Sequence, residues 1–155
     1  MRFKTMVTGV TLGCAAAISL LAGGFALEIA KPAGNAEAQA KKAVLLVRSY
    51  ACANPEKTVI TATAEGIVDG HRQSIPLKLE ALSQQSTFAL ARQWPAEGRF
   101  VITVTASNPK FGWTPGEMVK VEGDSVAFDD VKRLSHAPTK DEVEATLRTQ
   151  TIAMR

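Results

Sequence analysis

The sequence predicts a mainly β protein: a single antiparallel β-sandwich of about seven strands, preceded by an N-terminal signal helix and followed by a short C-terminal helix. Residues 99–107 alternate between apolar and mostly polar side chains, which is the period of a strand with one buried face. Turn-forming residues recur about every 8 to 12 positions. The only amphipathic helical pattern after the N-terminal segment lies near the C-terminus, so helices are not expected between the strands.

The N-terminus has the composition of a secretory signal. Arg2 and Lys4 precede an uncharged run of small and apolar residues that continues to Glu28. A basic start, an apolar run and then small residues describe a segment that directs export. An uncleaved membrane anchor is the alternative, because about 20 apolar residues suffice to span a bilayer. Under both interpretations the rest of the chain is expected outside the cytoplasm, in the periplasm or the extracellular space.

Two positions satisfy the small-x-small rule for cleavage, one after Ala26 and one after Ala40. We prefer the site after Ala40, because folded-domain character begins at Lys42. Cleavage after Ala26 would leave residues 27–41 as a flexible arm. The expected organisation is therefore a signal peptide at 1–40, a β-sandwich domain at 41–135 and a helical tail at 136–155.

Composition excludes some classes of function. From residue 41 onward, 15 Lys and Arg face 13 Asp and Glu without a basic cluster, so a nucleic-acid partner is not expected. That part of the chain contains one cysteine, Cys52, and cannot form an internal disulfide. Cys52 ends an apolar run, so we expect it to be buried, with pairing to another chain as the alternative.

The first expected strand covers residues 43–52 and is apolar on both faces at its start, as in a strand covered on both sides. Residues 59–68 form the second, with β-branched residues and a bulge expected at Gly66. Asp69-Gly70 then predicts a two-residue hairpin turn.

The return strand, residues 74–81, contains Pro76, which places it at a sheet edge. Residues 87–91 and 99–107 are expected to pair as a central hairpin through the turn Pro95–Gly98. Thr103 and Thr105 are expected to face outward or toward the C-terminal helix. The residues expected on the buried face are Leu77, Leu79, Phe88, Leu90, Phe100, Ile102 and Val104.

After the central hairpin comes the longest irregular stretch, residues 108–117. Two short strands, 118–122 and 126–131, are expected next. Thr139 and Glu142 have the spacing of a capping box, which predicts a helix over 140–150.

The segment Trp94-Pro-Ala-Glu-Gly-Arg-Phe-Val-Ile-Thr-Val combines a Pro-x-x-Gly turn with an aromatic residue and an alternating strand. Here the chain resembles exported bacterial Ig-like and transthyretin-like domains. The resemblance is limited to this hairpin, and it implies a module for binding, assembly or spacing. No Cys–Trp–Cys framework is present, so an antibody-type domain is not implied.

Three aromatic residues are candidates for partner binding: Phe111, Trp113 and Trp94. Aromatic side chains near turns can anchor a protein or stack on a sugar ring. The alternative is that Trp94 closes one end of the sandwich and that Trp113 covers the other. Trp113 lies in a loop rich in Pro and Gly, where binding residues often occur.

A metal site is the least supported candidate. His71, His136 and Cys52, together with Met118, are ligands soft enough for copper. None of them falls at a short ligand spacing such as H-x-H or C-x-x-C. The acidic residues near the last strands lack a calcium-loop pattern and are expected to form a solvated face: Glu117, Glu122, Asp124, Asp129 and Asp130.

The sequence contains no G-x-S-x-G, H-E-x-x-H or phosphate-binding loop, so we expect no enzyme and no cofactor. The leading hypothesis is an exported, non-enzymatic module that binds another envelope protein. Membrane contact is expected only through the N-terminal segment, if it stays uncleaved. The alternative is a small-ligand module that binds carbohydrate at Trp113 or copper at His71, His136 and Cys52.

Overall fold

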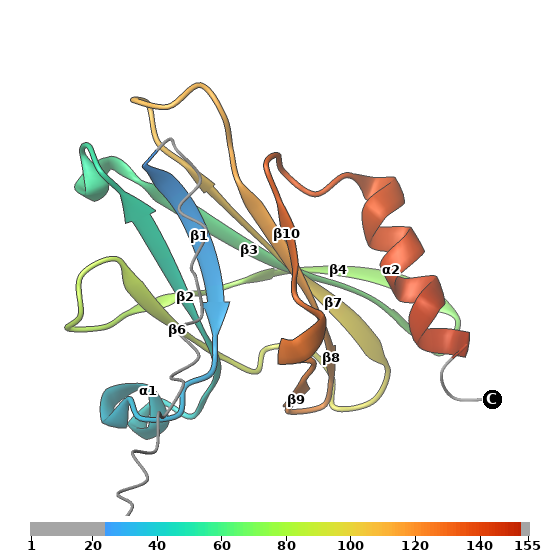
Figure 1. Ribbon diagram of the computed structural model, residues 1–155. Helices are drawn as coiled ribbons and strands as arrows, with labels where there is room; N and C mark the ends of the chain where they lie inside the picture. Colours follow the sequence, from blue (N-terminus) through green and yellow to red (C-terminus); the bar gives the residue numbers. More distant parts are fainter. Residues whose placement is uncertain (1–23, 153–155) are drawn as a thin grey trace, which may run out of the picture.

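The computed structural model describes residues 24–152 (Figure 1). They form a mainly β fold of two antiparallel sheets with a short C-terminal helix, which confirms the coarse prediction. The expected signal helix falls largely on residues 1–23, outside the described residues. Within residues 24–152, neither helix is long and apolar enough to cross a bilayer.

The smaller sheet has the order β1-β2-β6-β5 and the larger has the order β10-β8-β7-β3-β4, with β9 paired to β8. The strands of the smaller sheet are β1 (Phe25–Ala30), β2 (Ala43–Ala51), β5 (Glu80–Ala81) and β6 (Thr87–Ala91). Those of the larger sheet are β3 (Val59–Val68), β4 (His71–Leu77), β7 (Arg99–Ser107), β8 (Gly116–Glu122), β9 (Ser125–Val126) and β10 (Lys132–Leu134). The helical elements are α1 (Ala36–Ala40), η1 (Pro55–Lys57), η2 (Phe128–Asp130) and α2 (Lys140–Ile152).

The main core lies between the sheets. Strand β7 contributes Phe100, Ile102 and Val104, all fully buried, and β2 contributes Leu45 and Val47. The inward face expected for residues 99–107 is therefore confirmed. The other face of β7 packs on α2, where a second cluster unites Val101, Met118, Val143 and Leu147.

Strand β1 belongs to the folded domain. It pairs with β2 from Phe25 opposite Ala51 to Ala30 opposite Leu46. Its alternate side chains, Phe25, Leu27 and Ile29, are at most 6% exposed and enter the main core. The expected start of the domain at residue 41 is therefore wrong, because the apolar alternation in this segment is that of a strand.

Residues 27–41 do not form the flexible arm that we expected after a cut at Ala26. Helix α1 lies in this segment, and its Ala38 is fully buried against Leu46 of β2. Asn35 caps the helix by accepting a hydrogen bond from Ala38 N at 2.9 Å. Strand β2 is thus covered on both faces, as its sequence predicted.

The central hairpin is the main error of the sequence prediction. Both strands form, but β6 pairs with β2 and β5, whereas β7 pairs with β3 and β8. The connection 92–98 crosses from one sheet to the other instead of turning within one sheet. Trp94, only 4% exposed, lies on this crossing and donates from Nε1 to Gly123 O at 3.0 Å.

The turn at Asp69-Gly70 is confirmed. Both residues have positive φ, 49° and 79°, and Val68 pairs directly with His71. Strand β4 ends the larger sheet, as Pro76 predicted, but the expected return strand is divided, because β5 joins the smaller sheet.

Gly66 does not form the expected bulge. The register of β3 passes through it unbroken toward both β4 and β7. A Cβ atom at this position would lie 2.3 Å from Cδ1 of Phe100. Glycine is required here because the Phe100 ring packs directly on the backbone of β3.

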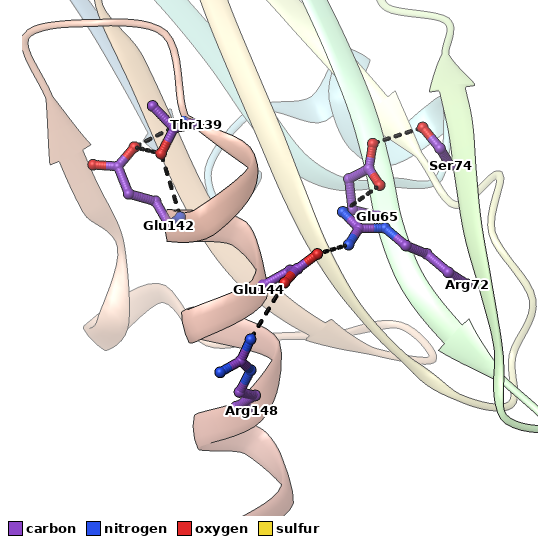
Figure 2. Close-up of polar contacts among 7 residues, drawn as sticks. All are labelled: Glu65, Arg72, Ser74, Thr139, Glu142, Glu144 and Arg148. Atoms are coloured by element: carbon purple, nitrogen blue, oxygen red, sulfur yellow. Dashed lines mark hydrogen bonds and ion pairs between the residues drawn. The ribbon is translucent and has the colours of Figure 1, made fainter.

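Helix α2 begins at the expected residue, and the expected capping box lies at its N-terminus. Glu142 accepts from Thr139 N at 2.8 Å, and Thr139 Oγ1 accepts from Glu142 N at 3.3 Å (Figure 2). The strand expected at 126–131 is replaced by β9, η2 and β10.

Candidate functional site

One end of the fold gathers several segments that are distant in sequence. The loop 108–115 between β7 and β8, the loop 52–58 between β2 and β3 and the start of β1 all lie there (Figure 1, top). Three aromatic side chains meet at this end, Phe25, Phe111 and Trp113, and we call this cluster the aromatic end.

Asn108 fixes the base of the aromatic end. Its side chain is 3% exposed and donates from Nδ2 to Asn54 O and to Thr58 Oγ1, both at 2.9 Å. Its Oδ1 accepts from Lys110 N at 2.9 Å, which folds the loop back on itself. Because one buried amide binds both loops, the aromatic side chains above it have a fixed support.

Phe25 is the centre of the cluster. Its ring stacks on Phe111, with centroids 4.9 Å apart and planes 12° from parallel. Trp113 meets it edge to face, with centroids 5.6 Å apart. Both are favoured geometries for aromatic pairs. Phe25 is 2% exposed, whereas Phe111 and Trp113 are half-buried and present the rest of their side chains to solvent.

Two large side chains close to strand termini at the aromatic end are exposed. Tyr50 of β2 is 51% exposed and Val59 of β3 is 59% exposed. The Tyr50 hydroxyl donates to Glu28 Oε2 at 2.5 Å, and partial burial, aided by this bond, raises the pKa of Tyr50. Because the hydroxyl already donates its single proton to Glu28, it offers a partner only its oxygen, as an acceptor.

Trp94 is not part of the aromatic end. The structure brings Phe111 and Trp113 together but places Trp94 on the sheet-to-sheet crossing, buried in the main core. Its burial fits the alternative considered above, in which Trp94 closes one end of the sandwich instead of binding a partner.

The three residues considered for a metal lie apart. His71 pairs with Val68 at the far end of β3 from Cys52. His136 Nε2 contacts Glu142 at 3.1 Å. Cys52 lies just past the end of β2 and is exposed, so its expected burial is wrong. Across residues 24–152, no three His, Cys, Asp or Glu side chains are grouped to hold a metal ion.

Glu117 is a buried carboxylate that joins the two sheets. It is 1% exposed, accepts from Ile29 N of β1 at 2.5 Å and accepts from Arg133 Nε of β10 at 3.0 Å. Burial raises the pKa of Glu117 to about 7, against the opposing effects of the Ile29 and Arg133 hydrogen bonds. The solvated face expected for the acidic residues is therefore wrong at this position.

A second surface lies between α2 and the β3–β4 hairpin. It is an open hollow of about 230 Å³ lined by Ile67, Arg72, Glu144, Leu147 and Arg148. Glu144 accepts from Arg72 at 2.5 Å and from Arg148 at 3.3 Å, and Arg72 also contacts Glu65 at 3.4 Å (Figure 2). Both arginines pair with the same Glu144, and Arg72 also pairs with Glu65 beside the hollow, so each guanidinium already has a carboxylate partner.

Sequence reasoning missed Phe25, Asn108 and Glu117. The alternation of Phe25, Leu27 and Ile29 was the available signal for the first, hidden by the adjacent apolar run. Asn108 and Glu117 carried no local signal, because their partners lie far away in sequence.

No protein-family model, curated protein or solved structure shows significant similarity to this chain.

Proposed function

We propose that the chain is an exported, non-enzymatic β-sandwich module of the Ig-like or transthyretin-like kind, which binds another protein of the cell envelope through the aromatic end. The supporting observation is that Phe111 and Trp113 are half-buried, with part of each side chain facing solvent, on a loop whose base is fixed by the buried Asn108. Aromatic residues seated in a packed surround are enriched among the residues that dominate protein interfaces.

Preorganisation supports a binding role for this loop. Ordering a loop on association costs free energy that a prefolded loop does not lose. Here Phe111 N donates to Asn108 O at 3.0 Å, and Ala106 N donates to Pro115 O at 3.1 Å, so both ends of the loop are hydrogen-bonded. Phe25 then holds the two aromatic side chains from below. The surface offered is apolar, so the partner is expected to present an apolar segment to it.

Site-specific photo-crosslinking tests this proposal. A photoreactive amino acid replaces Trp113 in the full chain, and the matched control carries it at Ile67, which is 49% exposed on β3 near the opposite end. After irradiation of whole cells, position 113 should yield one discrete protein adduct in the envelope fraction and position 67 should not. Equal adduct patterns at both positions, or no adduct at 113, would argue against the aromatic end as the interface.

A carbohydrate ligand is the second candidate, because Trp113 packs edge to face on Phe25 and remains only half-buried. An exposed indole face can stack on a sugar ring. Titration with a glycan panel separates the two: micromolar binding to the wild type that Trp113→Ala abolishes would favour the sugar. We do not propose a copper site, because His71, His136 and Cys52 lie apart.

A further inference from the structure

The two cleavage sites expected above, after Ala26 and after Ala40, both conflict with the fold. A cut after Ala26 divides β1 after its second residue and removes Phe25. A cut after Ala40 removes all of β1 and α1, including the buried Leu27, Ile29 and Ala38. Neither leaves the domain that the described residues form.

The loss of Phe25 alone would be costly. Its ring is 2% exposed and supports both Phe111 and Trp113. Removing a buried aromatic side chain leaves a cavity that its surroundings fill only in part. Loss of residues 25–40 would in addition uncover Leu46, which Ala38 covers, and would leave the Glu117 carboxylate without the Ile29 N–H.

Gly24 immediately precedes β1. It has a φ of +67°, and a Cβ there would lie 2.7 Å from Cys52 Sγ. Its carbonyl accepts from Cys52 N at 2.7 Å, just before the first β1 residue. The small-x-small rule is also met at a third bond, beyond the two considered above: Ala22 and Gly24 stand three positions and one position before the Gly24–Phe25 bond.

We propose that this bond is the processing site, so that the mature domain begins at Phe25; the inference rests on the proposed export of the chain. A signal peptidase of the export route hydrolyses the bond. Water supplies the hydroxyl of the new Gly24 carboxyl group and a proton to the new Phe25 amine, and the C–N bond between them breaks. Every core residue found within 24–152 is kept, because the first of them is Phe25.

The new N-terminus fits the strand. Hydrogen bonds to a neighbouring antiparallel strand involve alternate residues, and the Ile29 N–H points to Glu117 rather than to β2. Phe25 lies four residues before Ile29, so its nitrogen also points away from β2. A free amine at Phe25 therefore breaks no hydrogen bond between β1 and β2. Among residues 24–152, the bond lost is the one from Cys52 N to Gly24 O, beside an exposed side chain that water can reach.

The test is the N-terminus of the exported protein. The full chain is expressed in a bacterial host, and the envelope and cytoplasmic fractions are examined by N-terminal sequencing and intact mass. The wild type should begin at Phe25. Ala26→Leu, which changes a half-exposed residue, should also begin at Phe25, whereas Gly24→Leu should lose that product at least tenfold.

The outcomes separate this inference from the proposed function. Exported protein that begins at Leu27 or Lys41, or Ala26→Leu protein that stays unprocessed, would overturn the processing site and leave the envelope role intact. Exported protein that keeps residues 1–24 would overturn it as well. Intact chain confined to the cytoplasm would overturn both the processing site and the proposed function.

Discussion

The ring of Phe25, the first residue of β1, stacks on the ring of Phe111 in the loop between β7 and β8, with centroids 4.9 Å apart. Phe25 belongs to the smaller sheet, whereas Phe111 lies in a loop that joins two strands of the larger sheet, in a distant part of the chain. Their contact makes the candidate binding loop depend on the N-terminal strand. Anything that alters β1 should therefore alter the aromatic end.

Phe25→Ala should lower the free energy of unfolding by about 3–5 kcal/mol, as expected for truncating a buried phenylalanine. Tyr50→Ala, which removes a side chain that is 51% exposed, should cost less than about 1 kcal/mol. Urea denaturation of the purified proteins provides both values. In a double-mutant cycle with Phe111→Ala, a coupling of about 0.5–1.5 kcal/mol is expected from the stacked pair. Purely additive losses would contradict the stacking role.

Gly66→Ala should destabilise the fold by about 1–3 kcal/mol, the usual cost of overpacking a core. The new methyl group would lie 2.3 Å from the Phe100 ring and 2.7 Å from Arg99 O, so one of them must shift. Gly112→Ala is the matched control, since a Cβ there has no neighbour within 4 Å. Thermal unfolding should show a lower Tm for Gly66→Ala only; equal effects would mean that the contact between β3 and Phe100 is misplaced.

Glu117 should make stability fall as pH rises from 5 to 8. Its pKa is about 7 in the folded protein and 4.5 as the reference value, so over this window the folded state binds more protons than the unfolded state. Each unit of difference between the two pKa values corresponds to about 1.4 kcal/mol of unfolding free energy. The loss of stability caused by Glu117 over this window is therefore at most about 3 kcal/mol. The charged groups acting on it are Arg133 and Glu28.

Glu117→Gln keeps an oxygen acceptor for the Ile29 N–H and removes the titration. The difference in unfolding free energy between wild type and variant should therefore shift in the variant's favour between pH 5 and pH 8. Exposed carboxyls with lowered pKa, such as Glu142 and Glu144, lose their contribution only at more acidic pH and do not obscure this window. Parallel stability profiles for the two proteins would show that Glu117 is not buried as described.

Local patterns predicted what local forces determine. The alternation around Phe100 identified the buried face of β7, the Asp69-Gly70 pair identified the turn between β3 and β4, and the Thr139–Glu142 pair located the start of α2. The predicted pairing of β6 with β7 was wrong. A short connection such as 92–98 can turn back within one sheet or cross to the other, and the choice depends on the packing of Trp94, which lies far in sequence from its partner Gly123.

The aromatic end was half predicted for a similar reason. Phe111 and Trp113 stood out in an irregular loop, but Phe25 lay beside a run with the composition of a signal, which masked its strand alternation. Glu117 was read as a surface acid, because no pattern in one segment shows that a distant Ile29 N–H and Arg133 satisfy its carboxylate. Sequence periodicity reports which residues share a face, and not which distant segment covers that face.

The affinity of the partner recovered through position 113 tests the central claim most directly. Binding of the purified partner is measured for wild type, Trp113→Ala and Ile67→Ala by isothermal titration. If the aromatic end is the interface, Trp113→Ala should weaken binding by about 30-fold, the effect of losing a dominant residue worth about 2 kcal/mol, and Ile67→Ala should bind like wild type. Wild-type affinity in Trp113→Ala would contradict the account.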